Sequence, residues 1–130
     1  MYIRLKNRIF QDGHTEIIDQ TFPVDFQVKD GKTYLIYLNE DDERVILKLT
    51  DRELTMTRYS TPKSVMHFIR DDDAIVLIAS PAGLHHFRTR TKVFHKKEHS
   101  LSLEYDLLPL EGEALFALYQ LEIVWGEGEK

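Results

Sequence analysis

Alternation of apolar and polar residues with a period of two is the feature that most constrains the fold of this chain. It runs through residues 3–9, 22–28 and 45–49, where nearly every second residue is apolar and most of the others are charged or polar. Successive side chains of a strand point to opposite faces of a sheet, so this pattern predicts strands that bury one face. The segment 113–125 contains good helix formers, but its unbroken alternation from Leu115 to Trp125 favours a strand.

Short turn signals separate the alternating segments, and Asp30-Gly31 is a clear one because Asp-Gly favours a two-residue hairpin turn. The predicted strands span about residues 2–10, 14–29, 32–39, 43–50, 53–60, 64–70, 74–80, 84–95, 99–108 and 113–125. Such short connections leave no room for crossover helices, so the strands are expected to pair antiparallel as a meander. Because closure removes exposed strand edges, we predict an all-β fold, with the meander closed into a β-barrel of about 8–10 strands. Pro23 cannot donate a ladder hydrogen bond and predicts a bulge or bend in the second strand.

Composition and charge narrow the classes of protein to which the chain could belong. With 130 residues, 42% of them hydrophobic, it can bury one core, so we expect a single domain over residues 1–125 and a flexible tail over residues 126–130. The absence of cysteine excludes disulfides and thiolate sites and fits a cytoplasmic protein. The longest apolar run, Ala74 to Ala79, is too short to span a membrane. A net charge of −5 argues against a nucleic-acid partner.

One strand carries a row of cationic and ionisable side chains at alternate positions, namely His86, Arg88, Arg90 and Lys92. If the row faced the barrel lumen, its guanidinium groups could hold a carboxylate or phosphate. If it faced solvent, Phe87 and Val93 would pack inward. The second arrangement is favoured because arginine and lysine are seldom buried without partners. His86, Arg88 and Arg90 are nevertheless kept as candidate ligand-binding residues.

Arg58 is the stronger single candidate for a ligand contact. It continues the face set by Leu54 and Met56, so alternation aims its charge toward the interior. A buried cation needs a carboxylate, a backbone partner, a bound anion or a route to solvent. A structural ion pair or a solvent-reaching head group is favoured over a ligand contact, and both interpretations stay open.

The sequence offers little support for metal or catalytic chemistry. Residues 95–99 match the H-x-x-E-H pattern of zinc peptidases, but that motif needs a helix and these residues fall at a predicted hairpin. A hydrolase would have to use His67 or His86 with a carboxylate that folding brings close, and no spacing indicates such a pair. We predict no catalytic residue, no metal ligand and no cofactor, and we favour a non-enzymatic function.

Several short motifs keep a consistent order and spacing from Ile9 onward. They are Asp30-Gly31 leading to Tyr34-Leu35-Ile36-Tyr37, the strand Leu54-Thr55-Met56-Thr57-Arg58, Met66-His67-Phe68, Ser80-Pro81-Ala82-Gly83 followed by Thr89 and Thr91, and Leu103-Glu104-Tyr105-Asp106-Leu107. Together they resemble the YwiB-like family, a domain-of-unknown-function family of small bacterial proteins. The resemblance implies a calycin-type barrel, similar to lipocalins and fatty-acid-binding proteins, and no established activity. It also adds interest to Arg58, since the matching arginine is part of the family pattern.

These observations lead to three hypotheses about function. The leading one is a cytoplasmic, non-enzymatic barrel that binds a small anionic or amphipathic ligand in its lumen, with Arg58 orienting the polar end and Leu54 and Met56 enclosing the apolar body. The second is a protein-interaction or structural module, a homodimer with no lumen ligand. The third and most remote is a hydrolase-like enzyme.

Overall fold

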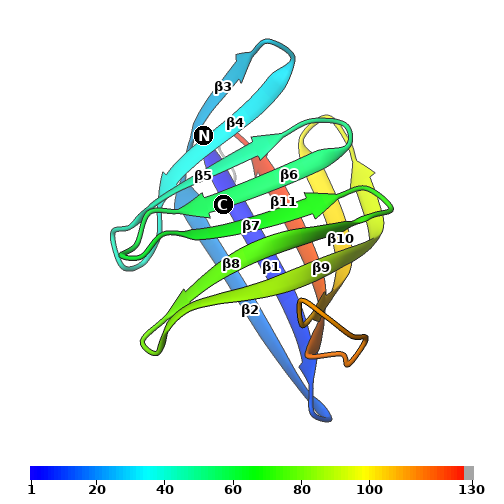
Figure 1. The fold of residues 1–130 in the computed structure, drawn as a ribbon. Coiled ribbons are helices and arrows are strands. Elements are labelled where there is room, and N and C mark those ends of the chain that lie inside the picture. Colours follow the sequence, from blue (N-terminus) through cyan, green and yellow to red (C-terminus); the bar gives the residue numbers. More distant parts are fainter. Residues whose placement is uncertain (128–130) are drawn as a thin grey trace.

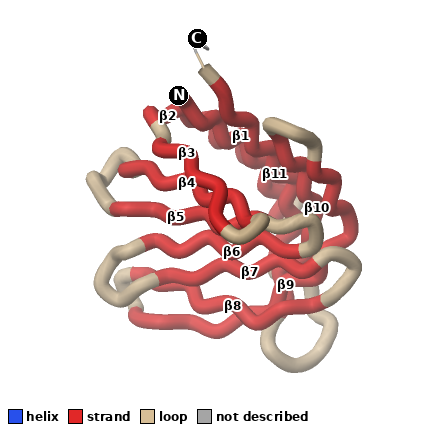
Figure 2. The backbone as a smooth tube through the Cα atoms, turned by 90° about the horizontal axis from the view of Figure 1, so that it is seen from above, coloured by secondary structure: helices blue, strands red, loops and turns tan. Residues whose placement is uncertain are grey.

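Residues 1–127 are described by a computed structural model, and every regular element in that range is a strand of one antiparallel sheet. The strands are β1 (Tyr2–Gln11), β2 (His14–Pro23), β3 (Asp25–Lys29), β4 (Lys32–Leu38), β5 (Arg44–Leu49), β6 (Glu53–Arg58), β7 (Ser64–Ile69), β8 (Asp73–Ser80), β9 (Gly83–Lys96), β10 (Ser100–Leu108) and β11 (Ala117–Gly126). Figure 1 shows the sheet curled around a common interior, and Figure 2 shows the same strands from above. The predicted all-β antiparallel barrel is confirmed, with a nearly closed sheet.

The order of strands explains how the sheet closes. It runs β2-β1-β11-β10-β9-β8-β7-β6-β5-β4-β3, so the two edge strands, β2 and β3, are consecutive in the chain. They are joined at Val24, whose backbone N–H donates to the Met1 carbonyl at 3.0 Å. One continuous stretch therefore pairs with β1 along β2 and with β4 along β3. This change of partner at a corner brings the two ends of the sheet together.

The predicted bend at Pro23 is confirmed, and it divides the stretch 14–29 into two strands. Because Val24 directs its N–H toward β1, position 23 directs its backbone toward the unpaired edge, where proline loses no ladder bond. This division accounts for the eleventh strand.

Two further features differ from the prediction. The final strand begins at Ala117 rather than at residue 113, and residues 109–116 form a loop. In the β9–β10 ladder the register shifts between Glu104 and Tyr105, so Lys92 has no partner opposite it. This β-bulge turns Val93 outward, where it is 38% exposed, and buries Phe94. The prediction that Val93 packs inward is therefore wrong, because alternation cannot register an inserted residue.

The N-terminus lies beside the end of β11 (Figure 1). Gly126 is the last residue of β11 and pairs with Tyr2, and the Glu127 carboxylate lies 3.6 Å from the N-terminal ammonium. The predicted flexible tail includes residues 128–130, which lie outside the described residues. The division of the chain into a domain over 1–125 and a tail stays a prediction.

The inward faces of the strands meet in one hydrophobic core. Three aromatic side chains cross it, with the Phe68 ring 4.5 Å from that of Tyr105 and the Tyr105 ring stacked on Tyr119 at 4.7 Å. Phe68 and Tyr105 are almost fully buried, and they come from strands that are three apart in the sheet. We call this row of rings the aromatic bridge, because it links opposite walls of the barrel.

Loss of the aromatic bridge should destabilise the folded protein. Phe68→Ala removes a ring that is 1% exposed, so we expect a loss of about 3–5 kcal/mol in the free energy of unfolding. Ile75→Ala is the matched control, since Ile75 points outward on the adjacent strand β8 and is 63% exposed. The control should change stability by less than about 0.5 kcal/mol. Urea titration followed by circular dichroism measures both, and similar losses in the two variants would contradict this account of the core.

Candidate functional site

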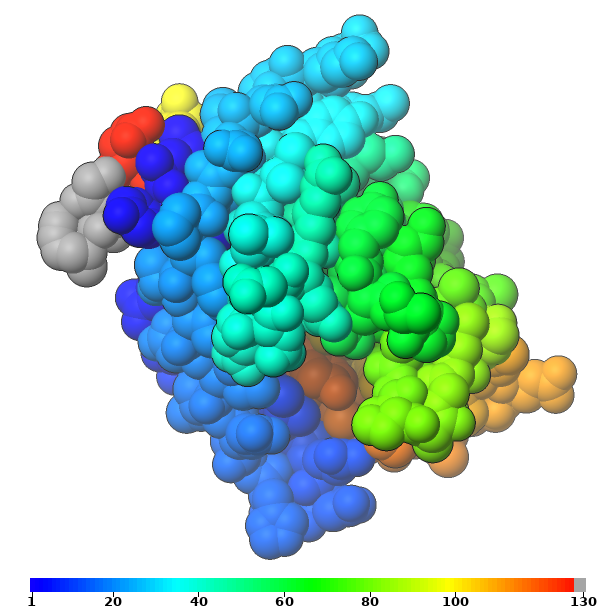
Figure 3. Space-filling model, turned by 90° about the vertical axis from the view of Figure 1, so that its left-hand side faces the viewer, coloured from blue at the N-terminus to red at the C-terminus, as the bar shows by residue number. Residues whose placement is uncertain are grey.

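The barrel is hollowed on one side, next to the unpaired edge of β2. Figure 3 shows this hollow between β2 in blue and the turns after β4, β6 and β8 in cyan to yellow-green, with an orange segment that leads into β11 at its floor. Closure at Val24 draws β2 against β4 only near the corner, where the rings of Phe22 and Tyr37 stack at 5.1 Å. Farther along β2 the gap is crossed by a hydrogen bond from Gln20 to Glu40. The hollow is therefore the part of the interior that the corner leaves open.

Half-buried apolar side chains lie on the inward strand faces, and two of them are close to the β6–β7 turn that borders the hollow. Met56 and Met66 stand directly opposite each other on β6 and β7, and both pack against the core while staying partly exposed. Tyr119, at the outer end of the aromatic bridge, is also only partly buried. Burial raises the pKa of the Tyr119 hydroxyl, and the nearby Glu16 carboxylate raises it further. These side chains form an apolar wall whose polar groups lie at its edges.

Arg58 lies at the rim of this wall, at the end of β6 and on the same face as Leu54 and Met56. Its Nη1 donates to Glu43 Oε1 at 3.1 Å, and its Nη2 donates to Ser64 Oγ at 3.0 Å. The Arg58 side chain as a whole is 37% exposed, as expected for an arginine that reaches solvent from a partly buried stem. The structural ion pair that the sequence favoured is present. A ligand contact by Arg58 stays a prediction.

The partner of Arg58 is itself held in place. Asn39 Nδ2 donates to Glu43 Oε1 at 3.0 Å, and the Glu43 backbone N–H donates to Asn39 Oδ1 at 2.9 Å. The hydrogen bond from Asn39, together with that from Arg58, lowers the pKa of Glu43. Glu43 therefore stays ionised and fixes the guanidinium plane of Arg58 at the rim.

Asn7 adds a polar atom to the interior. It occupies the inward face of β1 two residues beyond Leu5, and its side-chain Oδ1 is buried without a hydrogen bond to any described residue. Buried amide oxygens normally accept a hydrogen bond. A donor on a bound molecule would satisfy this oxygen.

The cationic row on β9 faces away from the hollow. Thr89 and Thr91, which alternate with it, are buried inward, so Arg88 and Arg90 point outward. Asp73 accepts from Arg88 Nη1 at 2.7 Å and from Arg90 Nε at 3.0 Å. Lys92 lies 3.0 Å from Asp106. The row is thus matched by carboxylates of neighbouring strands, and the ligand-binding role of His86, Arg88 and Arg90 stays a prediction.

The same arginines hold the loop of residues 109–116 against the end of the barrel. Arg88 donates to the carbonyl oxygens of Pro109 and Gly112, and Arg90 Nη1 donates to Glu113 Oε1 at 2.6 Å. At its far end the loop places the Phe116 ring 5.3 Å from that of Phe87, which lies on the inward face of β9. The loop therefore passes from the outer arginines to the inner face and covers this end of the barrel.

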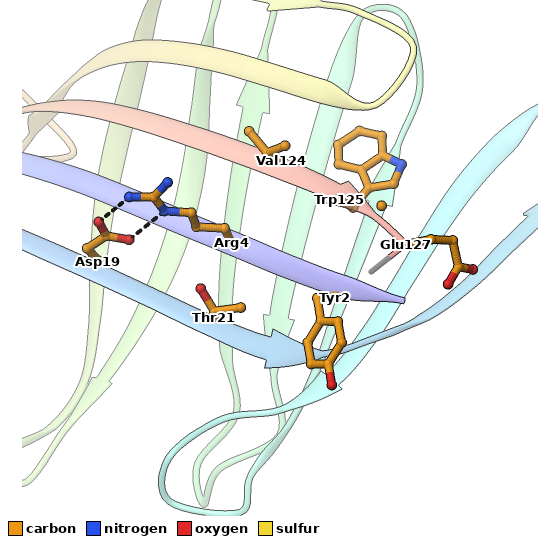
Figure 4. A pocket seen from close by; sticks show the side chains of 8 residues that line it. Tyr2, Arg4, Asp19, Thr21, Val124, Trp125 and Glu127 are labelled. Atoms are coloured by element: carbon orange, nitrogen blue, oxygen red, sulfur yellow. Dashed lines mark hydrogen bonds and ion pairs between the residues drawn. The ribbon is translucent and has the colours of Figure 1, made fainter. Parts of the chain in front are cut away.

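A second pocket, of about 640 Å³, lies on the outer face of β1, β2 and β11 (Figure 4). Arg4 crosses it to Asp19 through two bonds, Nε to Oδ1 at 2.9 Å and Nη2 to Oδ2 at 2.6 Å. The Arg4 hydrogen bond lowers the pKa of Asp19. Both carboxylate oxygens of Asp19 therefore accept from Arg4, so the two opposite charges in this pocket are paired with each other.

The side chains of the histidine pattern at residues 95–99 are not arranged as a metal site. His99 and Glu98 lie 3.8 Å apart in the turn between β9 and β10, and residues 1–127 contain no group of three or more His, Asp or Glu side chains placed to hold a metal ion. His67 bonds to Glu53 at 2.9 Å on the outer face. Residues 1–127 contain no helix that could span a membrane.

Several partners in the site were missed from the sequence. Ser64 stands opposite Arg58 across one hairpin, and Asp73 stands opposite Arg90 across another. Both pairs could have been predicted by counting equal numbers of residues outward from each turn. The contact of Glu113 with the β9 arginines could not have been predicted in this way, because Glu113 lies in an irregular loop.

Comparisons with known proteins agree with this fold. A family model described as a domain of unknown function (DUF1934) matches residues 3–123. The crystal structure of the ywiB protein from Bacillus subtilis is similar to the chain, with a TM-score of 0.75 and 23% sequence identity, covering 96% of this chain and 90% of that one. At that identity the likeness establishes the fold alone. No curated protein matches the sequence significantly.

The Asp73 cluster, which consists of Asp73, Arg88 and Arg90, should make the protein less stable at acidic pH. Hydrogen bonds from Arg90 and Arg88 lower the pKa of Asp73, so its contribution is present above the unfolded-state value and is lost as pH falls through the folded-state value. Asp73→Asn should reduce the free energy of unfolding at pH 7 by about 1–3 kcal/mol. The variant should also lose less stability than the parent between about pH 5 and pH 2.

Urea unfolding across this pH range tests the prediction. Asp71→Asn is the control, because Asp71 is an exposed turn residue with a φ of 60°, a conformation that asparagine tolerates. Equal pH slopes for the parent and Asp73→Asn would contradict the role given to the cluster.

Proposed function

The chain belongs to the DUF1934 family of unknown function, as its resemblance to YwiB-like proteins indicated, and we propose that it binds a small anionic, amphipathic molecule in the hollow of its barrel. The proposal treats the protein as a calycin-type binding barrel that acts in the cytoplasm without catalysis. The observation that carries it is the position of Arg58, a fixed cation at the rim of a half-buried apolar wall.

The apolar wall suits the hydrophobic part of such a molecule. Met56 and Met66 are flexible and polarizable, and methionines of this kind adapt to ligands of irregular shape. Tyr119 presents a ring that is already stacked on Tyr105, so the wall is rigid at one end and adaptable at the other. Ligand pockets are commonly apolar with a few fixed polar groups.

Arg58 suits the anionic part. A guanidinium carries five N–H donors, and only two of those of Arg58 are used by Glu43 and Ser64 among the described residues. The remaining donors can bind a carboxylate, sulfonate or phosphate through charge-assisted bonds without displacing Glu43. Asn7 Oδ1 offers an acceptor deeper in the interior.

Two fluorescent probes that differ in charge separate these contributions. The first is the anionic 1-anilinonaphthalene-8-sulfonate, and the second is the uncharged N-phenyl-1-naphthylamine. We expect saturable binding of both probes to the folded protein. Arg58→Gln should weaken the anionic probe by about 10-fold or more and the neutral probe by less than about 2-fold, since only the former makes a charge-assisted bond.

Arg52→Gln is the matched control, because Arg52 is exposed in the turn before β6, at the opposite end of that strand. It should leave both affinities unchanged. Met66→Trp, which enlarges a half-buried inward side chain of the apolar wall, should weaken both probes. Equal weakening of the two probes by Arg58→Gln, or no saturable binding by the folded protein, would contradict the proposal.

A further inference from the structure

We infer that β3 is a docking edge for a second copy of this chain, joined by antiparallel β3–β3 pairing about a two-fold axis. All five residues of β3 are exposed, and within residues 1–127 the strand pairs only with β4. Figure 1 shows the β3–β4 hairpin extending beyond the barrel wall. An exposed strand edge of this kind is a template for pairing with another chain.

The backbone groups that face outward can be identified from the hairpin. Lys29 and Lys32 flank the two-residue turn Asp30-Gly31, both of whose residues have positive φ, and the pair that flanks such a turn is hydrogen-bonded. Lys29 therefore bonds to β4, and by alternation Phe26 and Val28 direct their N–H and C=O groups to the open edge. Val24 follows the same alternation, because its N–H points away from β4 and bonds to Met1.

A two-fold register that pairs Phe26 with Val28 of the second copy satisfies these groups. The two Phe26–Val28 pairs exchange four backbone hydrogen bonds, and Gln27 lies opposite its own equivalent on the axis. Phe26 and Val28 share one face of β3 and are 38% and 62% exposed, so the pairing also brings four apolar side chains together. Aromatic and β-branched residues are favourable cross-strand partners.

The opposite face of β3 is complementary in charge in the same register. Asp25 lies opposite Lys29 of the second copy, and Lys29 lies opposite Asp25, so both pairs attract. Neither side chain forms an ion pair within its own chain among the described residues. This single register therefore pairs the outward-facing backbone groups of β3, brings its apolar side chains together and places opposite charges side by side.

The edge of β2 lacks these properties. Asp19 is held by Arg4, and Gln20 bonds to Glu40. Centring a β2 pair on Ile18 would place the apolar Ile17 opposite Asp19 of the second copy. In that register the β2 edge lacks the apolar matching that β3 shows.

Charge exchange between two variants tests the inference. In Asp25→Lys both charged positions of β3 are positive, and in Lys29→Asp both are negative, so each variant repels its own copy. We expect the parent to form dimers, and each variant alone to dimerise about 10-fold more weakly. An equimolar mixture should recover the parental affinity as a heterodimer, because positive then faces negative. Sedimentation velocity over a concentration series measures all three samples.

Lys97→Asp is the control, since it makes the same change in an exposed turn between β9 and β10 and should leave dimerisation unchanged. A parent that stays monomeric at concentrations up to about 1 mM overturns the inference. A mixture that associates no better than either variant alone also overturns it. Neither result bears on ligand binding in the hollow, which lies on another part of the barrel.

Discussion

The need to bury one face of a single antiparallel sheet governs this molecule. Nearly every strand is apolar on one side only, and residues 1–127 contain no helix that could cover that side, so the sheet must cover itself by curling. Curling requires the ends of the sheet to meet, and they meet where the chain changes partner at Val24. The core and the hollow both follow from the position of that corner.

Because the sheet closes at one corner, one part of the interior is tightly packed and another part is open. Next to the corner and across the aromatic bridge, the strands bury a continuous core from Ile3 to Trp125. Farther along β2 none of the described strands pairs with its open edge, and on the inward faces of β6 and β7 Met56 and Met66 stay half-buried. Charged side chains are accommodated at the boundaries, with Arg58 at the rim of the hollow and the β9 arginines holding the loop at the end of the barrel.

Much of the fold was accessible from the sequence, because alternation and turn residues are local signals. They identified the antiparallel meander, the bend at Pro23 and the inward position of Arg58. They could not place the bulge at Lys92, which reverses Val93 and Phe94, since one inserted residue leaves no mark in a local pattern. They also could not assign Glu113 to the arginines, because that contact depends on how an irregular loop crosses the end of the barrel.

The proposed function requires the part of the barrel interior next to Met56 and Met66 to admit a ligand. The chain has only three methionines, so a protein labelled with ¹³C at the methionine methyl groups gives a simple NMR spectrum. Titration with 1-anilinonaphthalene-8-sulfonate should move the Met56 and Met66 signals together, with saturation, while Met1 at the corner changes little. Saturable binding that leaves both of these signals unchanged would contradict the account.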